Sequence, residues 1–253
     1  MTKIVLNKIK KSLLAAFGNG FTTGMIIGGA ALNREVEDLL KLMKFPYTVG
    51  YGMTECGPII SYRDKAEYAK YSCGTNVGSV DIRIDSSNPY RVLGEIQVKG
   101  DATMLGYYNN EEATAAAFTS DGWLRTGDMG IFDRKGNLFI KGRCKNMILT
   151  GNGQNIYPEE IEDKLNSLPM VQECVVIQKG EKLYALIYPD MDTAKAQNLS
   201  EEDLKTIMEE NRKELNTQIP AYEQICGVKI MDKEFEKTPK RSIKRFLYKD
   251  AEV

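Results

Sequence analysis

The sequence predicts an α/β layer, then a β-rich segment that forms a small barrel, then a smaller α+β domain. Up to about residue 73, short apolar strands alternate with amphipathic helices, which is typical of a parallel α/β layer. Between residues 74 and 142, short alternating strands are broken by Gly, Asn, Asp and Pro. From Arg143 on, helices and strands mix, so we expect two domains, 1–142 and 143–253.

The α/β layer begins with a helix over residues 4–17, whose apolar residues recur at helical spacing. A short apolar strand follows at 25–27. Asn33 is typical of a helix N-cap, and Pro46 closes the helix that follows it. A second strand covers 47–49. Strand, helix and strand at this spacing predict a parallel pair whose functional loops lie at the carboxyl ends.

The later segments follow from the same patterns. In the β-rich segment we expect strands at 80–84 and 94–98. A first-position Pro and an acidic first turn predict a helix over 158–168. Ser200, with Asp203 three residues later, predicts another capped helix. The remaining expected strands are 171–177 paired with 183–188, and 225–231 before a basic tail.

The composition excludes several classes of function. With 253 residues, 42% hydrophobic and 27% charged, the chain has an ordinary globular mix. Its net charge of -1 gives no electrostatic reason to expect nucleic acid as a partner. The absence of His excludes Ser-His-Asp and Cys-His catalysis. Five cysteines without close spacing predict free thiols in a reducing cytoplasm, rather than disulfides or a zinc site.

Three motifs carry candidate chemistry, and the first is the segment 50–55, Gly-Tyr-Gly-Met-Thr-Glu, directly after a strand. Its glycines let the backbone approach a ligand closely. Tyr51 offers a flat face for a base, Thr54 a donor for phosphate oxygens and Glu55 a ligand for Mg²⁺. A strand-to-loop turn with a solvated Glu55 explains the segment equally well.

The second and third motifs are weaker by themselves. Asp128, in the segment 121–128, can accept both ribose hydroxyls, although a β-turn Asp bonded to its own backbone is the simpler explanation. Arg143 offers a forked donor for ribose or phosphate oxygens. The Gly-rich residues 151–153 precede a helix whose N-terminus can bind an anion. Acidic residues already occupy that first turn, so an ordinary turn is again the simpler explanation.

In this order and spacing, the segment 50–55, Thr126-Gly127-Asp128 and the stretch 142–162 resemble the adenylate-forming superfamily. This superfamily contains acyl- and aryl-CoA synthetases, luciferases and peptide-synthetase adenylation domains. The resemblance covers nearly the whole chain. The segments 28–32 and 155–162 look most like the long-chain fatty-acyl-CoA synthetase branch. It implies an ATP-dependent fatty acid–CoA ligase, the rest of an adenylate-binding domain followed by a lid domain, with ATP or AMP, Mg²⁺ and coenzyme A.

The resemblance also implies a role for each matching residue. The expected nucleotide contacts are Gly29, Ala30 and Ala31 around adenine, Tyr51 stacked on it with Gly52, Ile140 packed on the base, and Asp128 and Arg143 on the ribose. Thr54 would contact the α-phosphate and Glu55 would hold Mg²⁺. Lys145 would be the hinge about which the lid turns between adenylation and thioester formation. Gly153 would line the pantetheine tunnel.

Two features depart from the superfamily's pattern. Its Ser/Thr/Gly-rich phosphate loop ending in Lys is missing upstream of the first motif, since Thr22-Thr23-Gly24 runs into an apolar strand. We therefore expect a fragment that makes no acyl-CoA by itself. The late catalytic Lys of the family aligns with Ser242, so a basic neighbour would have to substitute for it. The candidates are Lys240, Arg241 and Lys244, unless the tail is only a solvated basic segment.

Other interpretations stay open. A CoA ligase for aryl or medium-chain acids and a peptide-synthetase adenylation domain share these motifs. The missing phosphate loop and Ser242 favour a non-catalytic nucleotide-binding or interaction module. The expected partners are a fatty acid or similar carboxylic acid, ATP and CoA, and peripheral contact with a membrane is left open.

Overall fold

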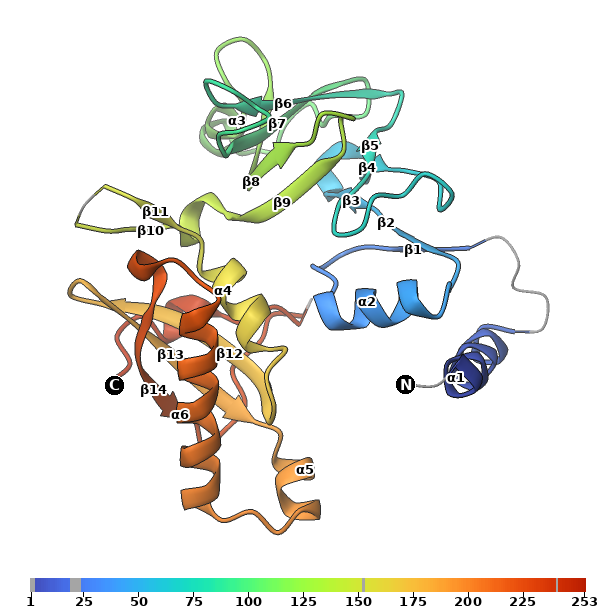
Figure 1. Cartoon of the computed structure of the whole chain (residues 1–253). Coiled ribbons are helices and arrows are strands. Elements are labelled where there is room, and N and C mark those ends of the chain that lie inside the picture. The colour runs from blue at the N-terminus through green and yellow to red at the C-terminus, as the bar shows by residue number, and fades with distance from the viewer. Residues whose placement is uncertain (1–2, 19–23, 152, 240) are drawn as a thin grey trace. The chain divides into compact units, whose positions relative to one another are not determined.

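The computed structural model describes residues 3–18, 24–151, 153–239 and 241–253 (Figure 1). The chain divides into two units, Met1–Cys144 and Lys145–Val253, and each has its own hydrophobic cores. Among the helices that the structure describes, none has the length and apolar character needed to span a bilayer.

The first unit opens with the strand–helix–strand element that the sequence predicts. β1 (Met25–Ile27) and β2 (Tyr47–Val49) pair in parallel, and α2 (Arg34–Leu42) connects them. The Asn33 side chain accepts the N–H of Val36 and so caps α2 as expected. The predicted first helix is also confirmed, as α1 (Lys3–Ala16).

The predicted β-rich segment, together with strands from residue 51 on, forms two open antiparallel sheets. One contains β3 (Tyr51–Gly52), β4 (Ile59–Tyr62) and β5 (Thr75–Asn76). The other has the order β6 (Val80–Asp85), β7 (Gly94–Gly100), β8 (Leu124–Phe132) and β9 (Leu138–Arg143), with α3 (Glu111–Ala117) between β7 and β8 in the chain.

The expected barrel is not closed within the described residues, because the edge strands β6 and β9 do not pair with each other. A closed barrel requires its first and last strands to pair, and this sheet of four leaves both as edges. Instead, its apolar residues, among them Ile96 and Leu124, pack with Cys56 and Ile60 in one shared core. The segment therefore consists of two open sheets that share one hydrophobic core.

The second unit is the predicted α+β domain. β12 (Val171–Lys179) and β13 (Lys182–Pro189) are antiparallel, and β14 (Ile225–Ile230) is parallel to β13. The helices are α4 (Pro158–Leu165), α5 (Met191–Ala196) and α6 (Glu201–Thr217), and the hairpin strands are β10 (Ile148–Leu149) and β11 (Asn155–Ile156). α4 ends three residues before the predicted position, and α6 has the predicted Ser200 and Asp203 capping box.

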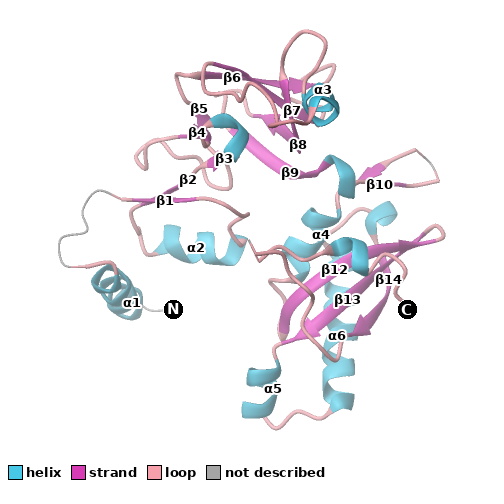
Figure 2. Ribbon diagram, turned by 180° about the vertical axis from the view of Figure 1, so that it is seen from behind, coloured by secondary structure: helices cyan, strands magenta, loops and turns pink. Residues whose placement is uncertain are grey.

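Both faces of the sheet β12–β13–β14 are covered, with α4 and α6 packed beside its strands (Figure 2). Successive strand residues point to opposite faces. Cys174 and Val176 accordingly join the core with α4 and α6, whereas Val175 and Ile177 pack with Phe235 of the C-terminal tail. The tail is thus anchored on the sheet and is not merely a solvated basic segment.

Candidate functional site

Three residues that lie far apart in the sequence meet at one carboxylate. Tyr51 belongs to β3, Asp128 to β8 and Arg143 to the end of β9. The Tyr51 hydroxyl donates a hydrogen bond to Asp128 Oδ2 over 2.7 Å. Arg143 Nε lies 2.9 Å from Asp128 Oδ1. The structure therefore brings together the residue predicted to stack on adenine and the two predicted to hold the ribose.

The surroundings of this cluster suit a carboxylate that binds hydroxyl groups. The Asp128 side chain is 10% exposed, and that of Arg143 is 52% exposed. Burial, reinforced by the charge of Asp128, raises the pKa of the Tyr51 phenol far above its ordinary value. The phenol is therefore protonated at neutral pH. An ionised carboxylate has about four lone-pair positions, so Asp128 can accept ribose hydroxyls in addition to these partners.

A bulge in β8 determines where Asp128 lies. The register shifts so that Thr126–Asp128 stand opposite the single residue Ile96 of β7. Thr126 Oγ1 donates to Ile96 O over 2.7 Å and accepts the N–H of Asp128 over 3.1 Å. Gly127 has a φ of +71°, a left-handed conformation that favours glycine. The Thr-Gly-Asp sequence therefore favours a local bulge, in which these three residues leave the regular pairing with β7.

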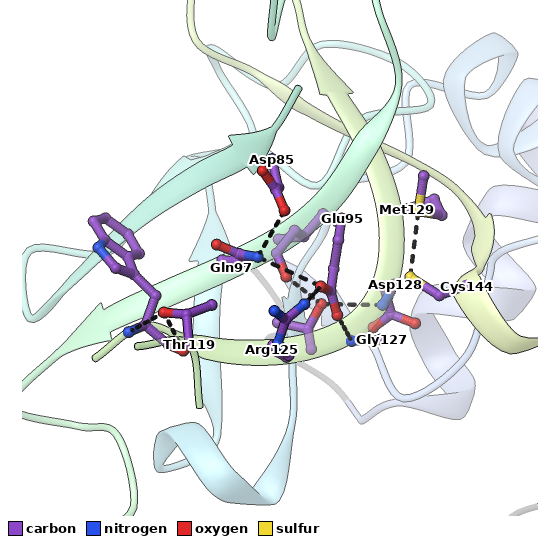
Figure 3. Close-up of polar contacts among 12 residues, drawn as sticks. Asp85, Glu95, Gln97, Thr119, Arg125, Gly127, Asp128, Met129 and Cys144 are labelled. Carbon is purple, nitrogen blue, oxygen red and sulfur yellow. Dashed lines mark hydrogen bonds and ion pairs between the residues drawn. The ribbon is translucent and has the colours of Figure 1, made fainter. Parts of the chain in front are cut away.

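Glu95 of β7 is a further residue at the bulge, and sequence reasoning missed it. Its Oε1 accepts the N–H of Gly127 over 3.2 Å, and its Oε2 pairs with Arg125 over 2.8 Å (Figure 3). Glu95 and Gly127 are 32 residues apart, so no local pattern in the sequence could reveal this contact.

The glycine loops after β1 and β2 begin side by side, as expected at the carboxyl ends of parallel strands. A Cβ atom on Gly28 would lie 3.1 Å from the carbonyl oxygen of Gly50. Gly29, Ala30 and Ala31, the expected adenine contacts, are exposed in the first of these loops. Ligand-accessible backbone therefore lies close to the start of the segment 50–55.

The hydrophobic partners of the site connect the two cores of the first unit. Tyr51 and Ile140 each pack against the core around Ile60 and also against the core around Val49. Tyr51 and Ile140 therefore share packing partners, and their expected role at the base stays a prediction.

Gly52 comes directly after Tyr51 in the chain, and the 3₁₀ turn Thr54–Cys56 begins two residues later. A Cβ atom on Gly52 would lie 1.8 Å from the carbonyl oxygen of Pro58, so only glycine fits there. Thr54 is exposed, and Glu55 is half-buried. Glu55 Oε1 accepts the Tyr107 hydroxyl over 3.1 Å, which orients the carboxylate.

One carboxylate and one hydroxyl are a donor set that fits Mg²⁺ but not a metal held by protein alone. Within the described ranges, no group of three or more His, Cys, Asp and Glu side chains is placed to hold a metal ion. Protein-bound Mg²⁺ commonly uses one or two carboxylates and takes its other ligands from phosphates and water. Glu55 with Thr54 nearby matches this pattern.

The remaining predicted residues belong to the second unit or fall outside the described residues. Lys145 is the first residue of that unit and is exposed, and Gly153, with φ of +76°, lies in the turn between β10 and β11. Lys244 pairs with Glu236 over 3.3 Å in the tail. Lys240 lies outside the described residues. Their roles stay predictions.

Two family models match the chain. The model described as AMP-binding enzyme matches residues 6–108, and the model described as AMP-binding enzyme C-terminal domain matches residues 145–250. Together they cover most of the chain, including both units.

Similar proteins are named as CoA ligases. A 4-coumarate–CoA ligase of Vanilla planifolia is 30% identical over 261 residues, which cover 98% of this chain and 45% of that protein. The O-succinylbenzoate coenzyme A synthetase MenE of Bacillus subtilis, solved in complex with AMP, has a TM-score of 0.74 and 26% identity, covering 97% of this chain and 50% of that one. Its complex with ATP and magnesium ion also has a TM-score of 0.74 and 26% identity, covering 96% and 50%.

These relatives define what the comparisons support. The chain spans about half the length of the curated relatives it matches. Their names refer to 4-coumarate and O-succinylbenzoate, so they lend no support to the predicted long-chain fatty-acyl branch. The matched models, the shared fold and the bound nucleotides of the solved relatives agree with the sequence resemblance. The chain therefore belongs to the AMP-binding family of adenylate-forming enzymes.

Proposed function

We propose that this chain supplies nucleotide-binding residues and the lid domain of an ATP-dependent acid–CoA ligase. The observation that carries the proposal is the cluster of Tyr51, Asp128 and Arg143, which assembles from three strands around one carboxylate. This cluster offers an aromatic face for adenine and charged or polar groups for the ribose. The CoA ligases among the relatives support the same reaction class.

In the proposed reaction, the carboxylate of the acid attacks the α-phosphorus of ATP, and pyrophosphate leaves. The thiol of CoA then attacks the carbonyl carbon of the acyl-adenylate, which forms the thioester, releases AMP and frees one proton. Asp128 and Arg143 would hold the ribose through both steps, and Tyr51 would hold the base. Thr54 would donate to the α-phosphate. Holding the reacting groups in place is itself a large part of such catalysis.

Glu55 would hold Mg²⁺, which would offset negative charge on the phosphate oxygens when bound. The hydrogen bond from Tyr107 to Glu55 restricts the carboxylate to one orientation. The chain carries no recognised phosphate loop. We therefore expect residues 1–253 alone to bind AMP weakly and to make no acyl-CoA.

The identity of the acid is the finer part of the proposal. The segments 28–32 and 155–162 resemble the long-chain fatty-acyl branch, which favours a fatty acid. The names of the relatives favour an aryl acid instead. Pyrophosphate exchange by the whole ligase with 4-coumarate, a medium-chain and a long-chain fatty acid would decide between them.

We further propose a cytoplasmic location, since all five cysteines are free in the structure and free thiols suit a reducing compartment.

The adenylate site is tested by AMP binding to the chain, measured by calorimetry. Asp128→Ala removes the acceptor for the ribose, and we expect the dissociation constant to rise at least about tenfold. Asp121→Ala is the matched control, because Asp121 is exposed and pairs with Arg83 away from the cluster. Equal AMP affinity in Asp128→Ala and the parent would show that the ribose assignment is wrong.

A further inference from the structure

The bulge that carries Asp128 depends on a carboxylate from the neighbouring strand. Regular pairing stops between Gln97 and Glu95, and Thr126–Asp128 leave the ladder there. The displaced backbone N–H groups then need other acceptors, because an unpaired partly buried N–H is costly. Thr126 Oγ1 accepts a hydrogen bond from the N–H of Asp128, and Glu95 Oε1 accepts one from the N–H of Gly127.

The Glu95 carboxylate is held in a position from which it can accept a hydrogen bond from the bulge in β8. It is only 16% exposed. Its Oε2 accepts Arg125 Nη1 over 2.8 Å and lies 3.4 Å from Gln97 Nε2, which leaves Oε1 directed at Gly127 (Figure 3). The carboxylate therefore bridges its own strand and the bulge of β8.

The ion pair with Arg125 does not by itself explain a half-buried glutamate here. Arg125 is 44% exposed, and exposed ion pairs contribute little to stability. The bond to Gly127 is different in kind, since Gly127 has a positive φ and directly precedes Asp128. A change in that turn rotates the peptide that carries the Asp128 side chain.

We propose that Glu95 is a positioning residue, which acts through the Gly127 turn to hold the Asp128 carboxylate in the orientation that binds ribose. The proposal rests on the proposed function of Asp128. This role is indirect, through the backbone turn, and needs no contact between Glu95 and the nucleotide. The role of Glu95 is to supply an acceptor, so an amide oxygen at the same place should restore part of that role.

The test compares three variants of the chain. Glu95→Ala removes the acceptor, Glu95→Gln keeps an oxygen for the Gly127 N–H, and Arg125→Gln removes the ion pair and its hydrogen bond to Oε2 while leaving the Oε1 acceptor in place. AMP affinity is measured by calorimetry per folded molecule, and hydrogen exchange at the amides of Gly127 and Asp128 by NMR. We expect Glu95→Ala to weaken AMP binding about tenfold, the size typical of one lost hydrogen bond involving a charged group. The two amides should also lose protection.

Arg125→Gln should retain affinity within about twofold of the parent, because it leaves the acceptor at Gly127 in place. Glu95→Gln should lose clearly less affinity than Glu95→Ala, because its neutral amide oxygen still accepts the Gly127 N–H, although more weakly than a carboxylate does. Parent-like affinity and protection in Glu95→Ala would overturn the inference. Equal losses in Arg125→Gln and Glu95→Ala would overturn it as well, since the ion pair would then be responsible. If the parent binds no AMP, the proposed function fails. Unchanged amide protection in Glu95→Ala would then refute the turn-holding role separately.

Discussion

At the scale of single residues, the position of Asp128 depends on groups from three other strands. Tyr51 of β3 donates to its Oδ2, and Arg143 of β9 approaches its Oδ1. Glu95 of β7 acts one residue away, on the N–H of Gly127. Each contact can be removed by a side-chain change that leaves the others in place.

Tyr51→Phe separates the ring from the hydroxyl. The phenylalanine ring can still stack on adenine, but the hydrogen bond to Asp128 is lost. We expect AMP binding to weaken about fivefold, since a net hydrogen bond is worth about 1 kcal/mol. The effect should be smaller than that of Asp128→Ala. Tyr108→Phe is the control, because Tyr108 is 93% exposed. Unchanged affinity in Tyr51→Phe would mean that the hydroxyl has no part in holding the site.

Cysteine reactivity gives a second prediction at this scale. Cys56, Cys73 and Cys174 are buried, and burial raises the pKa of the half-buried Cys144 thiol to about 11. Cys226 is exposed. Since the thiolate is the reactive form, a disulfide reagent at pH 7.5 should label one thiol rapidly. Cys226→Ser should abolish this fast phase and Cys144→Ser should not. Two fast thiols in the parent would contradict the burial pattern.

At the scale of elements, α4, β12 and the tail meet at Glu162 of α4. Glu162 accepts the N–H of Val176 over 2.6 Å and forms an ion pair with Arg245. Burial nevertheless raises the pKa of Glu162 from 4.5 to about 7, against the opposing effect of Arg245. The folded protein therefore binds a proton at pH values where the unfolded chain has released it.

The sign of the pH effect follows from this difference. The contribution of protonated Glu162 to the free energy of unfolding is fully present below about pH 4.5 and is lost as the pH rises through about 7. Urea unfolding between pH 5 and 7.5 should show this slope in the parent. Glu162→Gln should flatten it, whereas Glu210→Gln, at an exposed position of α6, should leave it unchanged. A slope as steep in Glu162→Gln would assign the effect to another group.

At the scale of the whole molecule, the division between the units falls just before Lys145. The side chain of Lys145 is exposed, in the 3₁₀ turn Cys144–Asn146. A hinge residue must change φ and ψ, which Pro cannot do because its φ is constrained. In the whole ligase, Lys145→Pro should therefore affect adenylation and thioester formation unequally. Lys145→Ala should affect neither strongly.

The two half-reactions are measured separately, as pyrophosphate exchange and as CoA-dependent thioester formation, each normalised to folded protein. A rigid surface loop predicts equal losses in both, in proportion to the folded fraction. Equal losses would remove the hinge assignment and leave the family assignment intact.

Local features could be predicted well from the sequence. Asn33 and the Ser200–Asp203 pair mark where helices begin, because capping involves residues three positions apart. The short helices α3 and α5, of seven and six residues, escaped prediction because they contain too few turns to show a period. The barrel was expected because strand patterns show that strands exist but not which edges pair.

By itself, the sequence determined several of the helices and strands, the family motifs and, through the resemblance, the residues expected at the nucleotide. Tyr51, Asp128 and Arg143 were all named from it. Only the tertiary structure decided that Tyr51 and Asp128, 77 residues apart, share a hydrogen bond, and that Glu95 accepts a hydrogen bond from the bulge that carries Asp128. The physical reason is that motifs and caps are made by neighbours in the chain, whereas register shifts and cross-strand contacts arise when distant strands pack.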